Sequence, residues 1–277
     1  MRHLEIQTPT ADGLMLYAQV WLPDDKPKAM LAFSHGQAEH SGRYAHLGAA
    51  LAEAGYGLYM ADLRGHGKSP GQRGHIMSWD DYRRDFAAIR EGARNTATDA
   101  KQFMGGHSLG GLIALDAALG NPPDCAGVIA SAPALRLAFV PPVWKVALGR
   151  MLANLVPDLT MSNELDASGL SHDVTVVQAY MNDPLVHGKV TARFFTEFTK
   201  AQAHTLQHAE DVRLPLLILH GSADPLIDPA GSREFYERAA SADKTLKVYE
   251  GLYHEAFNEP QKEQVIADLI GWLDAHL

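Results

Sequence analysis

The chain has 277 residues, of which 46% are hydrophobic and 21% charged, enough for one large α/β domain or two small ones. Its formal net charge is −9, so nucleic acids and strongly anionic membranes would repel the chain at long range. The net charge therefore excludes both as partners attracted by electrostatics. The single cysteine, Cys125, has no partner for an internal disulfide, which fits a reducing compartment.

The N-terminal sequence lacks the apolar core that a secretory signal needs. No window approaches the roughly 18 uncharged apolar residues of a membrane span. We therefore expect a soluble, cytoplasmic protein.

Short apolar runs alternate with longer helical patterns along most of the chain. This alternation predicts an α/β fold with a mostly parallel central sheet of about eight strands flanked by helices. The first two strands are joined by the turn signal Ala11-Asp12-Gly13 and should form an antiparallel hairpin at one edge. The predicted strands are 4–8, 14–22, 29–35, 57–63, 102–106, 127–133, 214–221 and 245–251, and the predicted helices are 41–54, 78–95, 109–120, 229–240 and 261–276.

Residues 134–208 break the alternation, because they contain no convincing strand. Helical patterns cover 141–157, 173–185 and 191–212. Since this segment lies between two predicted sheet strands, we expect a helical cap inserted into the core domain. The predicted division is a core of residues 1–133 and 209–277 and a cap of residues 134–208.

The first cap helix has an apolar stripe, which leaves two interpretations open. In the first, the stripe packs on the core, as most helical apolar stripes do, and lines a tunnel there. Alternatively, part of it makes transient contact with a membrane or micelle, with three basic side chains as local anchors. The stripe residues are Trp144, Leu148, Met151, Leu152 and Leu155, and the basic ones are Arg136, Lys145 and Arg150.

The stretch KQFMGGHSLGGLIALDAAL, residues 101–119, carries four glycines around one serine, Ser108. Gly106 to Gly110 match the pattern G-x-S-x-G, placed between a predicted strand and a predicted helix. This context indicates a nucleophile elbow, in which the serine occupies a sharp, strained turn. The alternative is a glycine-rich junction with an incidental serine.

A serine hydroxyl needs a base to take its proton, and that base needs an orienting acid. In this fold the chain order is serine, acid, histidine. Asp224 ends a late strand and is the predicted acid, whereas the rival Asp228 precedes Pro229 and should cap the next helix. His254, the first histidine after the last strand, is the predicted base. The rival histidines at strand ends are His35, His107 and His220.

The tetrahedral intermediate of an acyl transfer needs N–H donors for its oxyanion. One donor should be the amide of Leu109, directly after the serine. The other should be the amide of Gln37, in the loop after the third strand.

Six stretches over almost the whole chain resemble the α/β-hydrolases of the monoacylglycerol lipase and lysophospholipase group. They are SHGQAEHSGRY, DLRGHGKSPGQRG, GGHSLGG, NDPLV, LHGSADPLID and KTLKVYEGLYHE. The resemblance implies the triad Ser108, Asp224 and His254 and the oxyanion amides of Gln37 and Leu109. It also implies that Glu39, Arg43 and Tyr180 lie near the glycerol end of the substrate. The chain departs from the group at Ala38, where glycine is common.

The expected activity is a serine hydrolase that cleaves monoacylglycerols to glycerol and fatty acid through an acyl-enzyme. The alternatives are a lysophospholipase, a carboxylesterase for short to medium chains, and a non-hydrolytic small-molecule receptor on the same fold. The expected partner is a small lipid ester. We expect no cofactor and no metal, since no His, Asp or Glu spacing suggests zinc.

Overall fold

The computed structural model describes residues 1–139, 143–163 and 165–277, without the side chains of residues 143, 145, 146, 148 and 150. All eight predicted sheet strands are confirmed and form one sheet in the order β1-β2-β4-β3-β5-β6-β9-β10. The hairpin β1–β2 lies at one edge, as predicted, and β2 pairs antiparallel with β4, while the other neighbours are parallel. The strands are β1 (Arg2–Pro9), β2 (Met15–Leu22), β3 (Ala29–Ser34), β4 (Gly57–Ala61), β5 (Lys101–His107), β6 (Val128–Ser131), β9 (Leu216–Gly221) and β10 (Lys244–Tyr249).

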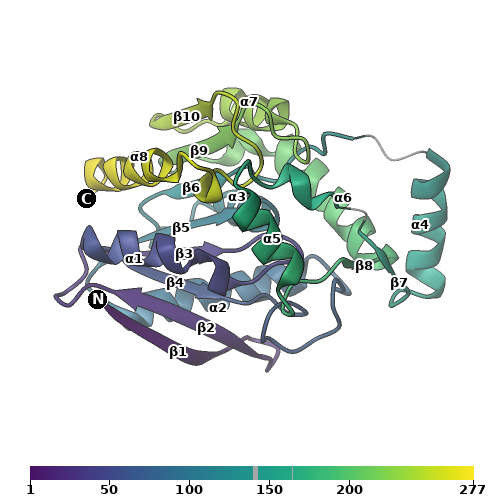
Figure 1. Ribbon diagram of the computed structural model, residues 1–277, viewed down its shortest axis with the longest axis horizontal. Coiled ribbons are helices and arrows are strands. Elements are labelled where there is room, and N and C mark those ends of the chain that lie inside the picture. Colours follow the sequence, from purple (N-terminus) through teal and green to yellow (C-terminus); the bar gives the residue numbers. More distant parts are fainter. Residues whose placement is uncertain (140–142, 164) are drawn as a thin grey trace.

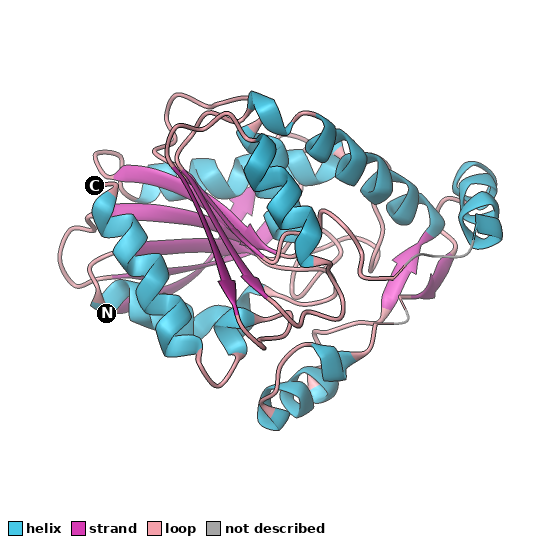
Figure 2. Ribbon diagram, turned by 90° about the horizontal axis from the view of Figure 1, so that it is seen from above, coloured by secondary structure: helices cyan, strands magenta, loops and turns pink. Residues whose placement is uncertain are grey.

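Helices cover both faces of this sheet (Figure 2). One apolar core joins the sheet to α1 and α8, and a second core on the other face joins it to α2, α3, α6 and α7. The five predicted core helices are present, although the first begins with the 3-10 turn η1 (Ser41–Tyr44). Their bounds are α1 (Ala45–Glu53), α2 (Asp80–Thr96), α3 (Leu109–Ala118), α7 (Pro229–Arg238) and α8 (Lys262–Ala275).

The segment 134–208 contains the predicted helices and a small sheet that we did not expect. Strands β7 (Thr160–Ser162) and β8 (Lys189–Thr191) pair antiparallel, so the prediction of no strand was wrong. Three-residue strands are too short for a period of two to be recognised. The helices are α4 (Val143–Leu155), α5 (Val174–Asn182) and α6 (Ala192–Gln207), with short 3-10 turns η2 (Ala167–Gly169) and, after α6, η3 (Ala209–Asp211).

The outer part of this segment stands at the side of the molecule opposite both chain ends (Figure 1). Helix α6, in contrast, buries Phe194, Phe198 and Ala201 in the same core as the sheet. The boundary between cap and core at residue 208 therefore stays a prediction. Within the described ranges, no helix is long and apolar enough to cross a membrane.

Six parallel strands end at one edge of the sheet, because β3, β4, β5, β6, β9 and β10 run in the same direction. The loops after these strands carry the predicted serine, acid, base and oxyanion donors. Open α/β sheets bind ligands at this carboxyl edge. The topology thus gathers residues that are up to about two hundred positions apart in the sequence.

Candidate active site

Ser108 occupies a strained backbone conformation between β5 and α3, with φ +53° and ψ −114°. Its carbonyl oxygen accepts hydrogen bonds from the N–H groups of Leu112 and Ala134, each at 3.0 Å. Its own N–H donates to the Ser131 carbonyl at 2.9 Å. A non-glycine residue with positive φ persists only where its surroundings hold it, and such strain clusters at functional sites.

The glycines on either side of the serine are needed because the backbone approaches itself closely there. A Cβ on Gly106 would lie 2.2 Å from the carbonyl carbon of Gly110. A Cβ on Gly110 would lie 2.1 Å from the Ser34 carbonyl oxygen at the end of β3. The pattern G-x-S-x-G therefore reflects a tight strand–turn–helix in which small residues let α3 pack against β3 and β5.

His254 and Asp224 are brought together from the loops after β10 and β9. His254 Nδ1–H donates to Asp224 Oδ2 at 2.7 Å, which leaves Nε2 free to take a proton. Asp224 Oδ1 accepts from the N–H groups of Leu226 and Ile227 at 2.9 and 3.0 Å, so the carboxylate is fixed. The rival Asp228 caps α7 through the Ala230 N–H, as predicted.

Burial and neighbouring charge set the pKa values of this pair. Burial alone would raise the pKa of Asp224, but His254 and the hydrogen bonds from His220 and His254 outweigh it and lower the pKa. Burial alone would lower the pKa of His254, but Asp224 and Glu255 outweigh it and raise the pKa. An ionised acid beside a histidine that readily holds a proton is what general-base catalysis with an imidazolium intermediate requires.

The rival histidine His107 is poorly suited to serve as the base. It directly precedes Ser108, and its ring centroid lies 4.6 Å from that of His254. Burial, together with the nearby His254, lowers its pKa to about 3. His107 therefore stays neutral near pH 7 and packs against His254.

One pocket at the carboxyl edge of the sheet is lined by the serine, the histidine and the oxyanion loop. A Cβ added to Gly36 would lie 3.2 Å from Ser108 Cβ, so this loop passes directly over the serine. In the described part of the chain, the N–H groups of Gln37 and Leu109 have no hydrogen-bond acceptor, which leaves them available to an oxyanion. The pocket residues are Gly36, Gln37, Glu39, His107, Ser108, Leu165, Leu170, Tyr180, His254 and Glu255.

The three residues expected near a glycerol group differ in their placement. Glu39 and Tyr180 line the pocket. Arg43 does not line it, because its guanidinium is held by the carboxylates of Glu39 and Glu255 and covered by the Tyr180 ring at 4.8 Å. Sequence reasoning missed Glu255, whose partner is 212 positions away and whose only local signal is its place beside His254.

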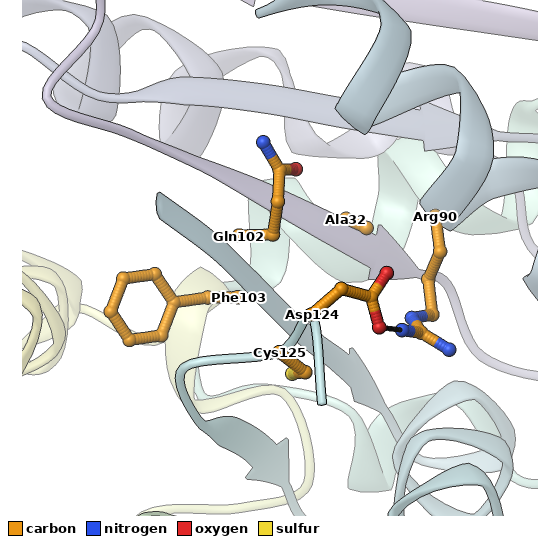
Figure 3. A pocket seen from close by; sticks show the side chains of 6 residues that line it. All are labelled: Ala32, Arg90, Gln102, Phe103, Asp124 and Cys125. Carbon is orange, nitrogen blue, oxygen red and sulfur yellow. Dashed lines mark hydrogen bonds and ion pairs between the residues drawn. The ribbon is translucent and has the colours of Figure 1, made fainter. Parts of the chain in front are cut away.

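A second pocket lies away from the serine, toward the amino ends of β5 and β6 (Figure 3). Its lining includes Arg90, whose guanidinium pairs with Asp124 at 2.9 Å, and the Cys125 thiol, whose pKa is raised by burial. Neither group faces the carboxyl edge. Among the described residues, no cluster of three or more His, Cys, Asp or Glu could hold a metal ion.

Residues 25–261 match the family model described as "serine aminopeptidase, S33". The chain is 38% identical over 267 residues to a monoacylglycerol lipase of Mycolicibacterium smegmatis, covering 96% of this chain and 95% of that protein. It is 31% identical to the phospholipase YtpA of Bacillus subtilis, covering 91% of this chain and 98% of that protein. The crystal structure of a monoacylglycerol lipase from Paleococcus ferrophilus superposes with a TM-score of 0.86 at 36% identity, covering 95% of this chain and 99% of the other.

Proposed function

The chain belongs to the serine aminopeptidase S33 family of α/β-hydrolases, and on this premise we propose that it hydrolyses monoacylglycerols to glycerol and fatty acid. Its likeness to monoacylglycerol lipases over nearly their whole length supports a carboxylic ester hydrolase. Because the chain belongs to a hydrolase family, we no longer favour the alternative that it is a non-hydrolytic receptor. The observation that carries the proposal is the meeting of Ser108, His254 and the Gln37 loop in one pocket.

In the acylation half, His254 Nε2 takes the proton of Ser108 Oγ while Oγ attacks the ester carbonyl carbon. The resulting oxyanion accepts hydrogen bonds from the Gln37 and Leu109 amides. Asp224 holds the imidazole in the tautomer with Nε2 free and stabilises the imidazolium. The bond between the carbonyl carbon and the alcohol oxygen then breaks, and glycerol leaves with the proton from Nε2.

In the deacylation half, a water molecule gives one proton to His254 Nε2 and its oxygen attacks the acyl carbon on Ser108. The same two amides hold the second oxyanion. The bond from the acyl carbon to Ser108 Oγ breaks, Oγ regains the proton from Nε2, and the fatty acid leaves. The cycle needs no group beyond the side chains and amides named here.

The direct test is fatty acid release from 1-monoacylglycerols of C8 to C18, beside p-nitrophenyl esters. Ser108→Ala should abolish release, while Asp228→Asn, which alters the helix cap near the acid, should stay active. Fastest release from monoacylglycerol would support the assignment. Turnover of p-nitrophenyl esters alone would keep the triad and contradict the lipid substrate.

A lysophospholipase is the second candidate, favoured by the likeness to a phospholipase of Bacillus subtilis. A lysophospholipid carries a phosphate on its leaving alcohol. The carboxylates of Glu39 and Glu255 line the pocket, while the guanidinium of Arg43 is already paired with both. This charge arrangement disfavours an anionic leaving group. Lysophosphatidylglycerols matched in chain length, whose leaving group carries a net negative charge, should therefore be poorer substrates than monoacylglycerols, and the opposite order would favour the second candidate.

We also infer that α4 touches the surface of a lipid aggregate. Trp144, Met151 and Leu155 on this helix are 64%, 52% and 71% exposed. Of the basic residues expected as anchors, Arg136 pairs with Glu234, and the side chains of Lys145 and Arg150 lie outside the described residues. Because the protein is acidic, we expect α4 to bind a zwitterionic surface through apolar contacts, and not an anionic surface through basic side chains.

Tryptophan fluorescence tests this contact, because Trp21, Trp79 and Trp272 are buried. Phosphatidylcholine vesicles should shift the emission of wild type to shorter wavelength, and Trp144→Phe should lose the shift. Leu155→Asp should reduce sedimentation with the vesicles. Equal sedimentation of wild type and Leu155→Asp would contradict the contact.

A further inference from the structure

A buried charge bridge, made of Glu39, Arg43 and Glu255, lies beside the pocket. Arg43 Nη1 donates to Glu39 Oε2 and to Glu255 Oε1, both at 2.6 Å, and Arg43 Nη2 donates to Glu255 Oε2 at 2.7 Å. The side chains of Glu39, Arg43 and Glu255 are only 3%, 10% and 4% exposed. Two parallel bonds from a guanidinium to one carboxylate fix direction as well as distance, so the bridge is a rigid connection.

The first end of the bridge holds the oxyanion loop. Glu39 Oε1 accepts from the Gly36 N–H at 2.6 Å and from the Tyr44 hydroxyl at 2.7 Å. Gly36 passes over Ser108 and directly precedes Gln37, whose amide is one of the two oxyanion donors. A displaced Glu39 would therefore displace the backbone that presents this amide.

The second end holds the loop that carries the base. Glu255 directly follows His254, and its Oε2 also accepts from Asn258 Nδ2 at 2.9 Å. Its backbone N–H donates to the Leu170 carbonyl at 2.8 Å, next to η2. His254 is thus held by Asp224 through its ring and by Glu255 through the adjacent backbone.

The bridge also acts on His254 through charge, because two carboxylates and one guanidinium leave one net negative charge. The groups that face the His254 ring are Asp224 after β9, His107 at the end of β5, Glu255 beside it, and Glu39 and Arg43 after β3. Tyr180 closes the side toward α5, where its ring covers the guanidinium. Glu255 and Glu39 both favour the protonated form of His254.

We propose that Glu255 is a positioning residue: through Arg43 it holds the base-bearing loop in register with the oxyanion loop, and its charge supports the imidazolium. The inference rests on the proposed function, in which His254 is the base and Gln37 supplies an oxyanion donor. It assigns Glu255 a role in every substrate's turnover, whatever the leaving group.

Glu255→Gln tests the role, since it keeps the shape of the side chain and removes its charge. The matched control is Glu250→Gln, an exposed position between β10 and His254. Both are assayed from pH 5 to 9 on a monoacylglycerol and on p-nitrophenyl butyrate, whose leaving group offers no glycerol hydroxyls. We expect Glu255→Gln to lower kcat about tenfold to a hundredfold on both substrates. The acid limb of its kcat/KM profile should move to lower pH, while Glu250→Gln matches wild type.

Glu255→Asp separates position from charge, because it keeps the carboxylate and shortens the side chain. It should retain the acid limb of wild type but lose kcat on both substrates, and it carries the test if Glu255→Gln fails to fold. A loss confined to monoacylglycerol would overturn the proposal, since it would make Glu255 a direct ligand of glycerol. An unmoved acid limb in Glu255→Gln would overturn it too.

A readout independent of turnover keeps this proposal separate from the proposed function. The low-field NMR signal of the His254 Nδ1 proton, bonded to Asp224, can be titrated in wild type, Glu255→Gln and Glu250→Gln. A lower midpoint in Glu255→Gln alone would support the bridge even if no ester were hydrolysed in a Ser108-dependent way. Identical midpoints in all three proteins would overturn the bridge and leave the hydrolase assignment intact.

Discussion

Ala38 offers a sharp test of strain in the oxyanion loop. It has a φ of +69°, in the left-handed region, and is fully buried. Its carbonyl accepts from the His187 N–H at 3.1 Å, so the segment before β8 holds this turn. A left-handed conformation costs an alanine about 1–2 kcal/mol, whereas glycine adopts it freely. We therefore expect Ala38→Gly to release strain that, among the described alanines, only Ala132 shares.

Three contributions determine how much Ala38→Gly changes the free energy of unfolding. Removing a buried methyl group costs about 0.8 kcal/mol. The greater freedom of glycine in the unfolded chain costs a further 0.5–1 kcal/mol or so. Released strain of about 1–2 kcal/mol offsets both, so the free energy of unfolding should change by less than about 1 kcal/mol.

The matched control is Ala114→Gly, at an equally buried position in the right-handed backbone of α3. There no strain is released, and the loss should be about 2 kcal/mol, from the methyl group and the lower helix propensity of glycine. Urea unfolding of both variants measures the difference. If Ala38→Gly were as destabilising as Ala114→Gly, the reasoning about strain at Ala38 would be refuted.

Three further outcomes check the site. Gln37→Ala should keep more than about a tenth of kcat/KM, because the backbone N–H serves the oxyanion, whereas Ser108→Ala should have no measurable activity. Asp224→Asn should lower kcat about 10⁴-fold with unchanged circular dichroism, since the amide no longer fixes the His254 tautomer, and a loss below tenfold would contradict the assignment. Because the base must be neutral and the pKa of His254 is raised from 6.5, the acid limb of kcat/KM should lie above about pH 6.5, and full activity at pH 5.5 would argue against His254.

Much of the fold could be predicted because its signals are local. Each sheet strand is a short apolar run between helical patterns, and burial on both faces of a parallel sheet demands such runs. The elbow glycines are likewise adjacent to Ser108 in the sequence. The order of serine, acid and histidine then selected Asp224 and His254, which the structure brings within hydrogen-bond distance.

The remainder depends on contacts between distant segments. The bond between Arg43 and Glu255 joins loops that no periodic pattern connects. The pairing of β7 with β8 spans about thirty residues and involves three residues on each side. Similarly, the conformation of Ala38 is imposed by its neighbours, because alanine itself has no preference for positive φ.

The position of the chain ends has a practical consequence for work on surfaces. Both ends lie on the side of the molecule opposite α4 (Figure 1). A tag or tether at either end would therefore attach the protein to a solid support with α4 turned toward the solution. A fusion at the N-terminus and a fusion at the C-terminus would therefore orient the enzyme in the same way. In both cases, large lipid aggregates in solution should still reach α4 of the immobilised enzyme.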